Sequence, residues 1–580
     1  MLDKDVYPKR YDVLVVGAGH AGLEAALAAA RMGRATLLLT QNLDTIGAMS
    51  CNPSIGGVAK GQLVRELDAL GGEMAKNTDR AGLHYKTLNM SKGQAVRSPR
   101  AQCDKKLYAL SMKEVAESQE NLDARQDEAA GLWIDGSRLR GVISKRGTRY
   151  EASAVVLTTG TFLDGLAHVG LRSFPSGRAG DQPAVGLSAS LRELGLATGR
   201  MKTGTPPRLH ARSIDYSRCE EQPSDAPPEP FSHFTERVAN PLLSCYITYT
   251  SARTHEIIRE SLDRSPLYSG VIKSIGPRYC PSIEDKVVKF PHKERHQVFL
   301  EPEGFRTKEV YVNGLSTSLP EDAQLELVRS VPGLERAEIM RPGYAIEYDY
   351  CPPTQLAPTL ETKSVPGLFF AGQLNGTTGY EEAAVQGFVA GVNAALRTLD
   401  KPPLVLSRDA AYAGVLIDDL VTKGVDEPYR MFTARAEFRL SLRADNADLR
   451  LLETGRRLGL IGDEFFARFE RYREAVGGKE FADAELAPWS MSKARAQREI
   501  QDSYAGYVLR ERKAAEKLRA ADAIAIPEDL DFAAVGALPP EARQKLARVR
   551  PRTLGQAGRI PGVTPADVQI LWVLARRAAR

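Results

Sequence analysis

The feature that most constrains the fold lies near the start of the chain, where an apolar run leads directly into a glycine-rich turn. Residues 11–16 (YDVLVV) predict a buried strand, and the alanine-rich stretch 21–32 predicts a helix. Between them, residues 17–22 (GAGHAG) have the spacing G-x-G-x-x-G, and a second apolar run follows at 35–39. This order of strand, glycine turn, helix and strand predicts the opening unit of a parallel α/β sheet.

The three glycines of this turn have separate physical roles. Gly17 permits the tight turn, Gly19 lets the backbone approach a pyrophosphate, and Gly22 lets the helix pack closely on the strand. The helix N-terminus offers free N–H groups and partial positive charge to phosphates. A purely structural turn is the alternative, but the flanking strand and helix favour dinucleotide binding. The residues predicted to bind the cofactor here are Gly17, Ala18, Gly19, His20, Ala21 and Gly22.

Later features favour FAD over simple NAD binding at this turn. The second strand ends in Thr40 and Gln41, without the acidic side chain that holds the ribose in NAD-binding units. Residues 154–161 (AVVLTTGT) and 365–373 (VPGLFFAGQ) predict further strands that end in small-residue turns. In FAD-dependent reductase-like folds, a late strand and the helix after it bring a second helix N-terminus to the flavin. Gln373 stands where many of these folds carry Asp.

The separation of these strands along the chain predicts a domain that is interrupted by an insertion. The intervening residues carry many prolines and short alternating runs, which favour mixed, β-rich structure, and the pattern after about residue 405 is helical and charged. The predicted fold class is α/β: an FAD-binding Rossmann-like domain of the glutathione-reductase type, split by a mixed α+β insertion and followed by an all-helical domain. The predicted bounds are 1–200 and 356–405 for the split domain, 201–355 for the insertion and 406–580 for the helical domain.

Composition excludes several classes of protein. The chain of 580 residues is 43% hydrophobic and 26% charged, as is usual for soluble globular proteins, and it has no apolar run long enough to predict a membrane span. Its six cysteines form no C-x-x-C pair and its histidines show no ligand spacing, so we expect neither a disulfide framework nor a metal site. The N-terminal stretch lacks a signal-peptide pattern, and we expect a cytoplasmic protein.

Two cysteines stand in sequences that suit a reactive thiolate. A thiol gains thiolate character from nearby positive charge or from a helix N-terminus. Cys51 lies in SCNPSIGGVAKG, where Pro53 and two glycines suggest a shaped loop that leads to a helix. Cys280 is flanked by Arg278, and Lys286 follows six residues later. For each cysteine, the alternative is a small buried hydrophobic side chain.

Basic residues gather in two parts of the C-terminal third. Residues 541–580 carry nine Lys/Arg against two Asp/Glu, whereas the whole chain has a net charge of +5. In the segment 429–443, arginines recur every four to five residues near one face of a predicted helix, with Phe432 and Phe438 between them. This pattern suits phosphate contacts and base stacking in RNA, and a solvated Arg/Glu helix surface is the alternative. The residues predicted to bind RNA here are Arg430, Arg435 and Arg439.

Several long strings, spread over nearly the whole chain, are far more specific than a general flavin fingerprint. They resemble the family of tRNA uridine 5-carboxymethylaminomethyl modification enzymes, called MnmG or GidA. The strings include DTIGAMSCNPSIGGVAKGQLVRELDALGG (44–72), GPRYCPSIEDKVVKF (276–290), LFFAGQLNGTTGYEEAAVQG (368–387), EPYRMFTARAEFRLSLRADNADLRL (427–451) and TLGQAGRIPGVTPADV (553–568).

The resemblance implies an FAD-dependent enzyme that uses NADH as reductant and methylenetetrahydrofolate as one-carbon donor. With a GTPase partner, MnmE, it would add an aminomethyl or carboxymethylaminomethyl group to C5 of the wobble uridine (position 34) of tRNA, taking nitrogen from glycine or ammonium. The resemblance further implies a homodimer that forms a heterotetramer with the GTPase. The helical domain would bind the tRNA and the partner, and the tRNA would be held by its anticodon stem-loop.

The resemblance also implies roles for single residues. Addition of a thiolate to C6 makes C5 of uridine nucleophilic, and Cys51 and Cys280 match the family's functional cysteines. Which of the two is the nucleophile stays open. Asp285 is a candidate proton handler, with an ion pair to a neighbouring lysine as the alternative. Ser188 and Gln373 match flavin contacts of the family.

By the same resemblance, the segment 276–290 contributes to the NAD site, and Arg278 and Lys286 would also hold the anticodon stem. The residues assigned to the NAD site are Gly276, Pro277, Arg278, Tyr279, Pro281, Ser282, Ile283, Glu284, Lys286, Val287, Val288, Lys289 and Phe290.

Two other enzyme classes compete with this interpretation. The related folate- and FAD-dependent tRNA uridine C5 methyltransferase shares the flavin domain but lacks the long helical C-terminal part. A generic FAD/NADH oxidoreductase usually carries a redox pair of cysteines, and it would need neither the arginine-rich segment nor the basic C-terminal end.

Overall fold

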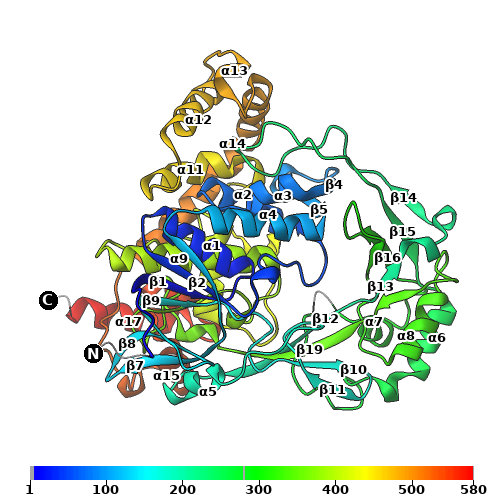
Figure 1. Ribbon diagram of the computed structural model, residues 1–580. Coiled ribbons are helices and arrows are strands. Elements are labelled where there is room, and N and C mark those ends of the chain that lie inside the picture. Colours follow the sequence, from blue (N-terminus) through cyan, green and yellow to red (C-terminus); the bar gives the residue numbers. More distant parts are fainter. Residues whose placement is uncertain (1–4, 279–280, 579–580) are drawn as a thin grey trace.

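A seven-stranded sheet forms the centre of the protein in a computed structural model that describes residues 5–278 and 281–578 (Figure 1). Across the sheet, neighbouring strands follow the order β6 (Leu122–Gln126), β2 (Thr36–Thr40), β1 (Tyr11–Val16), β9 (Arg149–Leu157), β8 (Arg138–Ser144) and β7 (Ala129–Asp135), and β20 (Leu368–Phe370) also pairs with β9. Strands β6, β2, β1, β9 and β20 run parallel, whereas β7 and β8 pair antiparallel. The apolar strands β1 and β2 are buried because helices or other layers cover both faces of a parallel sheet.

Two helices from distant parts of the chain pack together beside this sheet. Helix α1 (His20–Arg31) follows the glycine turn, and α9 (Tyr380–Thr398) follows β20. Gly387 and Gly391 allow the two backbones to approach, since a Cβ on Gly387 would lie 1.9 Å from the carbonyl oxygen of Ala21. The late segment therefore completes the first α/β unit, as the predicted split domain requires.

Residues between β9 and β20 form two antiparallel sheets, and one of these sheets includes residues 166–175, which precede the predicted insertion. The four-stranded sheet has the order β11 (Arg172–Pro175), β10 (Leu166–Val169), β19 (Tyr344–Tyr350) and β12 (Gly199–Thr205). The six-stranded sheet has the order β14 (Glu220–Gln222), β15 (Cys245–Tyr249), β16 (Gln297–Pro302), β17 (Glu309–Asn313), β13 (Arg208–His210) and β18 (Ile339–Arg341). Helices α6 (Ala252–Glu260), α7 (Ile283–Lys289) and α8 (Glu321–Arg329) pack on the larger sheet, and together they form a separate apolar core on the right of Figure 1.

A small three-stranded sheet carries the loop that contains Cys51. Its order is β3 (Ser54–Gly56), β5 (Ser98–Cys103) and β4 (Gly82–Leu88), and it packs beside α2 (Lys60–Ala69), α3 (Met74–Ala81) and α4 (Lys105–Ser118). Glu66 of α2 is buried and accepts hydrogen bonds from the backbone N–H groups of Tyr412 (2.9 Å) and Ala413 (3.0 Å). These bonds join helix α10 (Tyr412–Asp418) to the domain built on the seven-stranded sheet, which is called the FAD-type domain below.

The C-terminal part is helical, and after Phe370 the described residues form no further strand. Its helices are α10 (Tyr412–Asp418), α11 (Ala447–Arg457), α12 (Asp463–Val476), α13 (Asp483–Leu486), α14 (Met491–Asp522), α15 (Pro540–Val549), α16 (Leu554–Arg559) and α17 (Pro565–Ala578). They enclose two small cores, one around α12 and α13 at the top of Figure 1 and one around α15–α17 near the lower left. No helix in the described part of the chain has the length and apolar character that a membrane crossing needs.

Candidate functional site

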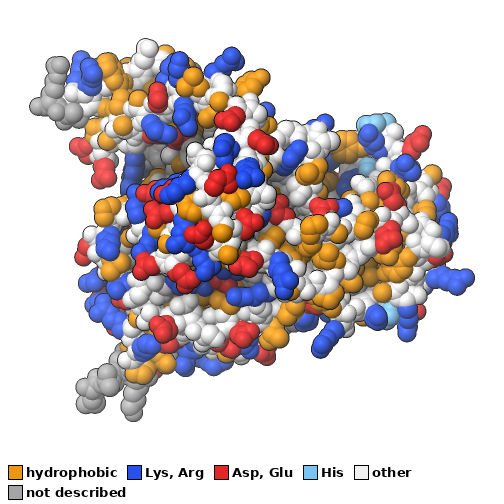
Figure 2. All heavy atoms as spheres, turned by 90° about the horizontal axis from the view of Figure 1, so that it is seen from above, with side chains coloured by type: hydrophobic (Ala, Val, Ile, Leu, Met, Phe, Trp, Pro, Cys, Tyr) orange, Lys and Arg blue, Asp and Glu red, His pale blue; other side chains and the backbone are white. Residues whose placement is uncertain are grey.

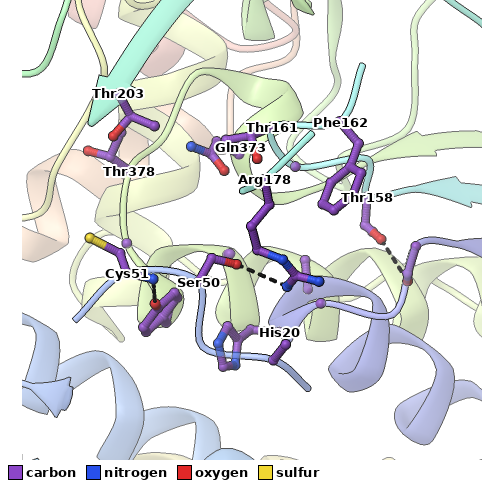
Figure 3. Close-up of a pocket in the computed structure, with 18 of the residues that line it drawn as sticks. His20, Ser50, Cys51, Thr158, Thr161, Phe162, Arg178, Thr203, Gln373 and Thr378 are labelled. Carbon is purple, nitrogen blue, oxygen red and sulfur yellow. Dashed lines mark hydrogen bonds between the residues drawn. The ribbon is translucent and has the colours of Figure 1, made fainter. Parts of the chain in front are cut away.

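A cavity of about 1010 Å³ opens at the carboxyl ends of the parallel strands, the edge at which open α/β sheets bind their ligands. Its wall includes the glycine turn, the turn 158–162 after β9, parts of the loop 48–58 and parts of the segment 371–383. These segments lie far apart in sequence. Figure 3 shows His20, Cys51, Thr158 and Gln373, one side chain from each of them, around a common space.

The geometry of the turn separates two structural glycines from one that faces the cavity. Gly17 has a φ of +100°, and a Cβ there would lie 2.6 Å from the carbonyl oxygen of Thr158. A Cβ on Gly22 would lie 1.7 Å from the carbonyl oxygen of Gly17. A Cβ on Gly19 would meet nothing within 4 Å, because this residue faces open space. That arrangement leaves room for a ligand to approach the backbone at Gly19.

The residues around the turn fit the pyrophosphate end of a dinucleotide such as FAD. Helix α1 begins after Gly19 without a side-chain cap, so its first N–H groups face the cavity end of the helix. In the part of the chain that the structure describes, the buried polar atoms of the cavity wall without a hydrogen-bond partner include Nε2 of His20, Oγ1 of Thr159 and Oδ1 of Asn52. Such atoms are normally satisfied, and a bound ligand would satisfy them. The volume also lies at the upper end of the range for small-molecule sites, about 300–1,000 Å³.

His20 is held as a neutral side chain beneath the turn. Its ring centroid lies 4.3 Å from that of Tyr380, and its Nδ1 lies 3.5 Å from the hydroxyl oxygen of Tyr108. Burial lowers its pKa to about 4, and the nearby carboxylate of Glu381 only partly opposes that effect. An uncharged imidazole can offer the cavity either a donor or an acceptor at Nε2.

A buried ionic group lies at the N-terminus of α9. Lys60 Nζ lies 2.7 Å from Oε2 of Glu381 and 3.6 Å from Oε2 of Glu382. The Lys60 ammonium keeps the pKa of Glu381 below its usual value against the effect of burial, whereas burial raises the pKa of Glu382. The Lys60 ammonium therefore neutralises the Glu381 carboxylate, and Glu382 keeps its proton to a higher pH than Glu381 does. Lys60 and Glu381 line the cavity.

Cys51 lies where the FAD-type domain meets the insertion. Its backbone N–H donates to the hydroxyl oxygen of Tyr380 (2.7 Å), which fixes the loop against the start of α9. Its Sγ lies 2.9 Å from the hydroxyl oxygen of Tyr311 on β17. The thiol is partly exposed and lines the cavity, as Figure 3 shows. Thus the predicted dinucleotide turn and one of the two predicted cysteines share one cavity.

The sequence interpretation missed two polar residues of the cavity wall. Asp127 follows β6, and its N–H donates to the carbonyl oxygen of Thr40 (2.9 Å), so an acid stands beside the strand end that lacks one of its own. Arg178 donates to Ser50 (3.2 Å) and pairs with Asp181 (2.5 Å), and in Figure 3 it extends toward Ser50 across the cavity. The family resemblance suggested a contact between Gln126 and Ala130 but assigned no residue there, and Asp127 reaches the cavity through the parallel pairing of β2 with β6. No spacing indicated Arg178.

The two residues matched to flavin contacts lie in different surroundings. Gln373 follows β20 and lines the cavity (Figure 3). Ser188 is fully buried in α5 (Leu187–Glu193) and donates to Asp349 (2.5 Å), and the cavity wall contains its neighbour Leu187 instead.

The segment 276–290 lies mainly in the insertion. Of its described residues only Pro277 lines the cavity, while Gly276 packs against Lys202. Tyr279 and Cys280 lie outside the described residues. Arg278 is exposed and pairs with Glu427 (3.0 Å), which places this segment beside the arginine-rich one.

Helix α7 holds the remaining residues of that segment. Pro281 precedes it and Ser282 caps it, while Ile283 and Val287 belong to the core of the insertion. Glu284 is buried and accepts from Thr317 (2.8 Å), and the Lys286 ammonium donates to the carbonyl oxygen of Gly314 (2.9 Å). Asp285 pairs with Lys289 (2.9 Å), the ion pair that was its alternative, while Val288 and Phe290 are exposed. The described residues contain no cluster of three metal-ligating side chains.

The arginine-rich segment does not form the predicted helix. Only a 3-10 turn, η9 (Thr433–Arg435), interrupts an irregular chain before η10 (Ala444–Asn446), so the arginines share no helix face. Arg430 lines the cavity, Arg435 stacks on the ring of Tyr429 (4.4 Å), and Arg439 is exposed. Positive and negative side chains are interspersed over the face in Figure 2, so that face shows no single basic surface.

Comparison with known proteins decides the family. The family described as "Glucose inhibited division protein A" matches residues 12–402, and one described as "tRNA modifying enzyme MnmG/GidA C-terminal helical bundle" matches residues 514–580. The curated MnmG of Geobacter sulfurreducens is 56% identical over 98% of this chain and 98% of its own. The chain belongs to the MnmG/GidA family.

Solved structures agree with this membership and confirm the predicted fold class. A structure of Aquifex aeolicus GidA has a TM-score of 0.91 at 48% identity and covers 99% of this chain and 100% of that one. The curated relative from Geobacter metallireducens is also 56% identical, over 97% of this chain. The curated relatives carry the name "tRNA uridine 5-carboxymethylaminomethyl modification enzyme MnmG". The C-terminal bundle match lies in the long helical part of the chain.

Proposed function

We propose that this MnmG/GidA family member is an FAD-dependent enzyme that installs an aminomethyl or carboxymethylaminomethyl group on C5 of the wobble uridine of tRNA. The observation that carries the proposal is the single cavity in which a dinucleotide-binding turn and the Cys51 thiol lie together. The name of its curated relatives supports uridine in tRNA as the target.

The chain offers distinct groups for each part of the cofactor. The N-terminus of α1 and the backbone at Gly19 would hold the pyrophosphate, Asp127 the ribose, and Gln373 the far end near α9. When bound, the flavin would supply the redox and one-carbon transfer chemistry that amino acid side chains cannot supply. The surrounding wall orients the cofactor and limits the access of water.

Cys51 would act on the uridine ring. A thiolate that adds to C6 forms an S–C6 bond and opens the C5–C6 double bond, so that the electron pair develops at C5 and attacks the one-carbon electrophile. Loss of the C5 proton then expels the thiolate and restores the double bond. Cys280 stays the second candidate for this role. Asp285 is proposed for proton handling only if α7 moves, because its carboxylate pairs with Lys289.

The remaining reactants and partners complete the proposal. NADH would reduce the flavin, methylenetetrahydrofolate would provide the one-carbon unit, and glycine or ammonium the nitrogen. An MnmE-type GTPase would act on a homodimer of this chain to form a heterotetramer, and the cytoplasm would be the site of the reaction. Arg278, which is exposed beside Glu427, Arg430, which lines the cavity, and the exposed Arg439 would contact the anticodon stem-loop.

Reconstitution tests this function. The purified protein should be yellow from bound flavin and, with the GTPase, GTP, NADH, methylenetetrahydrofolate and ammonium or glycine, should convert the wobble uridine of unmodified tRNA. Nucleoside mass analysis reads the product. A flavin-free protein, or flavin-loaded protein that leaves the uridine unchanged in the complete mixture, would contradict the proposal.

A further inference from the structure

The environment of Cys51 Sγ is built mostly by the insertion. Its nearest polar neighbour is the hydroxyl of Tyr311 at 2.9 Å, and the carbonyl oxygen of Gly204 and the hydroxyl of Thr205 each lie 3.9 Å away. All three neighbours come from strands more than 150 residues further along the chain. When the sulfur carries its proton, either atom of the Cys51–Tyr311 pair can donate. When the sulfur is a thiolate, only Tyr311 can donate, so the contact favours the thiolate.

Tyr311 is fixed by its position in the six-stranded sheet. It is buried on β17, directly opposite Arg208 of β13 and Glu301 of β16 in the strand register. The Arg208 guanidinium lies 4.9 Å from the centroid of the tyrosine ring. A phenol held by both neighbouring strands and by a cation has little freedom to turn away from the sulfur.

Arg208 connects this sheet to the loop that carries the cysteine. It is buried and donates to Glu303 (3.0 Å), Thr205 (2.6 Å) and the carbonyl oxygen of Ser50 (3.3 Å), the residue before Cys51. Burial alone would lower its pKa, but the Glu303 carboxylate, followed by Tyr311 and Cys51, raises it. A permanently charged guanidinium therefore stands beside the Cys51–Tyr311 pair.

The other described cysteines lack such surroundings. Cys103, Cys245 and Cys351 are buried, and burial raises the pKa of each of these thiols. Burial also raises the pKa of Cys219, whose Sγ donates to the carbonyl oxygen of Asp215 (3.7 Å). Among the described cysteines, Cys51 alone lines the cavity and lies beside a hydroxyl donor with a neighbouring cation.

We propose that Tyr311 is a positioning residue that activates Cys51: its hydroxyl donates a hydrogen bond to the Cys51 thiolate, and Arg208 holds the two groups together. The inserted unit thus supplies the donor for a cysteine of the FAD-type domain. The proposal deepens the proposed function, on which it rests for the role of Cys51 as the reactive thiol. In the ionisation the Cys51 thiol loses its proton to solvent, and the Tyr311 O–H bond stays intact.

The reactivity of the thiol tests this without any tRNA. The holoenzyme is treated with 4,4′-dithiodipyridine from pH 5 to 9, and mass spectrometry follows the Cys51 peptide. The Cys51 thiolate attacks the disulfide, a mixed disulfide forms, the probe's S–S bond breaks, and thiopyridone leaves. Thiolate population and intrinsic nucleophilicity change in opposite directions when a donor is removed, and the population changes more.

Tyr311→Phe should therefore slow the labelling of Cys51 by about 4- to 15-fold at the acidic end of the range, since hydrogen bonds to charged groups are the stronger class. At the alkaline end the variant should react as fast as the wild type or faster, because a thiolate without its hydrogen-bond donor is the stronger nucleophile. Such a crossing supports thiolate stabilisation. A change in the accessibility of Cys51 to the probe would instead change the labelling rate by the same factor at every pH. That result overturns the proposal, and so does a pH profile identical to that of the wild type.

Two further variants complete the test. Tyr344→Phe is the matched control, because Tyr344 also lines the cavity but its hydroxyl accepts from the N–H of Ala179 (3.2 Å), and its labelling profile should match the wild type. If Tyr311→Phe fails to fold, 3-fluorotyrosine at position 311 keeps the shape with a stronger donor. It should accelerate labelling at the acidic end, and an unchanged rate overturns the proposal. The labelling assay needs no tRNA and is therefore independent of uridine modification. If the variants label as expected but the wild-type protein fails to modify uridine in the complete mixture, only the proposed function is refuted.

Discussion

At the scale of single residues, two kinds of constraint act on the glycine turn at residues 17–22: packing within the protein and the approach of a ligand. Gly17 and Gly22 are required by the packing of the protein itself, because a side chain at either would collide with backbone oxygen atoms. Gly19 meets no protein atom, so the packing of the protein does not require glycine there, whereas the close approach of a ligand to the backbone would.

This difference predicts opposite outcomes for two substitutions. Gly19→Ala should keep the stability of the wild type but reduce flavin affinity at least tenfold, because the new methyl group occupies the path of the pyrophosphate. Gly22→Ala should lower the free energy of unfolding by about 1–3 kcal/mol, because the helix must move away from Gly17. Flavin titration and denaturant unfolding separate the two effects. Equal flavin affinity in Gly19→Ala would place the cofactor elsewhere.

His20 should make stability depend on pH. Its folded pKa of about 4 lies below the ordinary value of 6.5, so the unfolded chain takes up the proton first as the pH falls. The stability that the neutral ring contributes is present above pH 6.5 and is lost between pH 6.5 and 4, by about 3 kcal/mol in total.

His20→Gln removes this titration, and its free energy of unfolding should vary less between pH 6.5 and 4 than that of the wild type. Denaturant unfolding at several pH values measures the difference. Parallel pH profiles for the two proteins would show that the ring accepts a proton in the folded state.

The sequence could predict the glycine turn because its three constraints are local. It could predict Cys51 as a candidate from its loop, but it could not predict Tyr311, Arg178 or Asp127 as its companions in the cavity wall. Those side chains reach the site through strand pairing and through the contact of the insertion with the FAD-type domain, and no spacing along the chain encodes either.

At the scale of elements, the close packing of α1 and α9 explains how the split domain closes. Gly387 and Gly391 lie one helical turn apart on α9, and a Cβ on Gly391 would lie 2.3 Å from the carbonyl oxygen of Ala25. Each glycine lowers the helix propensity of α9, and the contact of the two helices compensates for that cost.

Gly391→Ala should therefore destabilise the protein by about 1–3 kcal/mol, because the two helices must separate. Gly506 of α14 is the matched control, since a Cβ there meets nothing within 4 Å and alanine is the better helix former. Gly506→Ala should stabilise by about 0.5–1 kcal/mol. Thermal unfolding compares them, and a shift of the same sign in both variants would contradict this account of α9.

The arginine-rich segment shows why periodicity failed at one element. Its spacing suits a helix, but the backbone of Tyr429 bonds to Gly376 (2.8 Å) and Thr378 (2.8 Å), and the N–H of Met431 donates to Glu382 (3.0 Å). These contacts with the start of α9 take the backbone groups that a helix would use internally. Tertiary contacts therefore overrode the local pattern.

At the scale of the whole molecule, an ionic network joins the C-terminal bundle to the body of the protein. Arg559 of α16 donates to Asp418 (2.7 Å), which also accepts from Arg408 (3.0 Å). Arg408 further pairs with Asp419 (2.7 Å), and all four side chains are largely withdrawn from solvent. The network lies at the contact of α16 with the segment after α10.

Arg559→Ala should loosen this contact by up to about 3 kcal/mol, because it removes one of the two guanidinium groups that pair with the buried Asp418 carboxylate. Hydrogen exchange in residues 554–578 should become faster while the flavin stays bound. Arg495→Ala breaks an exposed pair with Glu480 and should change exchange in its surroundings little. Unchanged exchange in Arg559→Ala would show that other contacts hold the bundle.

At this scale, the sequence predicted the order of the structural elements better than it predicted the contacts between domains. A strand followed by a helix near residue 370 indicated a return to the sheet begun at residue 11, since parallel strands are joined by long crossover connections. The relative placement of the insertion and the helical part could not be predicted, since it depends on buried pairs such as Glu66 with Arg450 (2.9 Å) that form across more than 380 residues.

The most direct test of the central claim uses tRNA from a strain that lacks this chain. Mass analysis of wobble nucleosides should find no C5 aminomethyl derivatives in the deletion strain, full restoration by the wild-type protein and by Cys219→Ser, and no restoration by Cys51→Ser that still binds flavin. Unchanged C5 aminomethyl derivatives in the deletion strain, or full restoration by Cys51→Ser, would contradict the account.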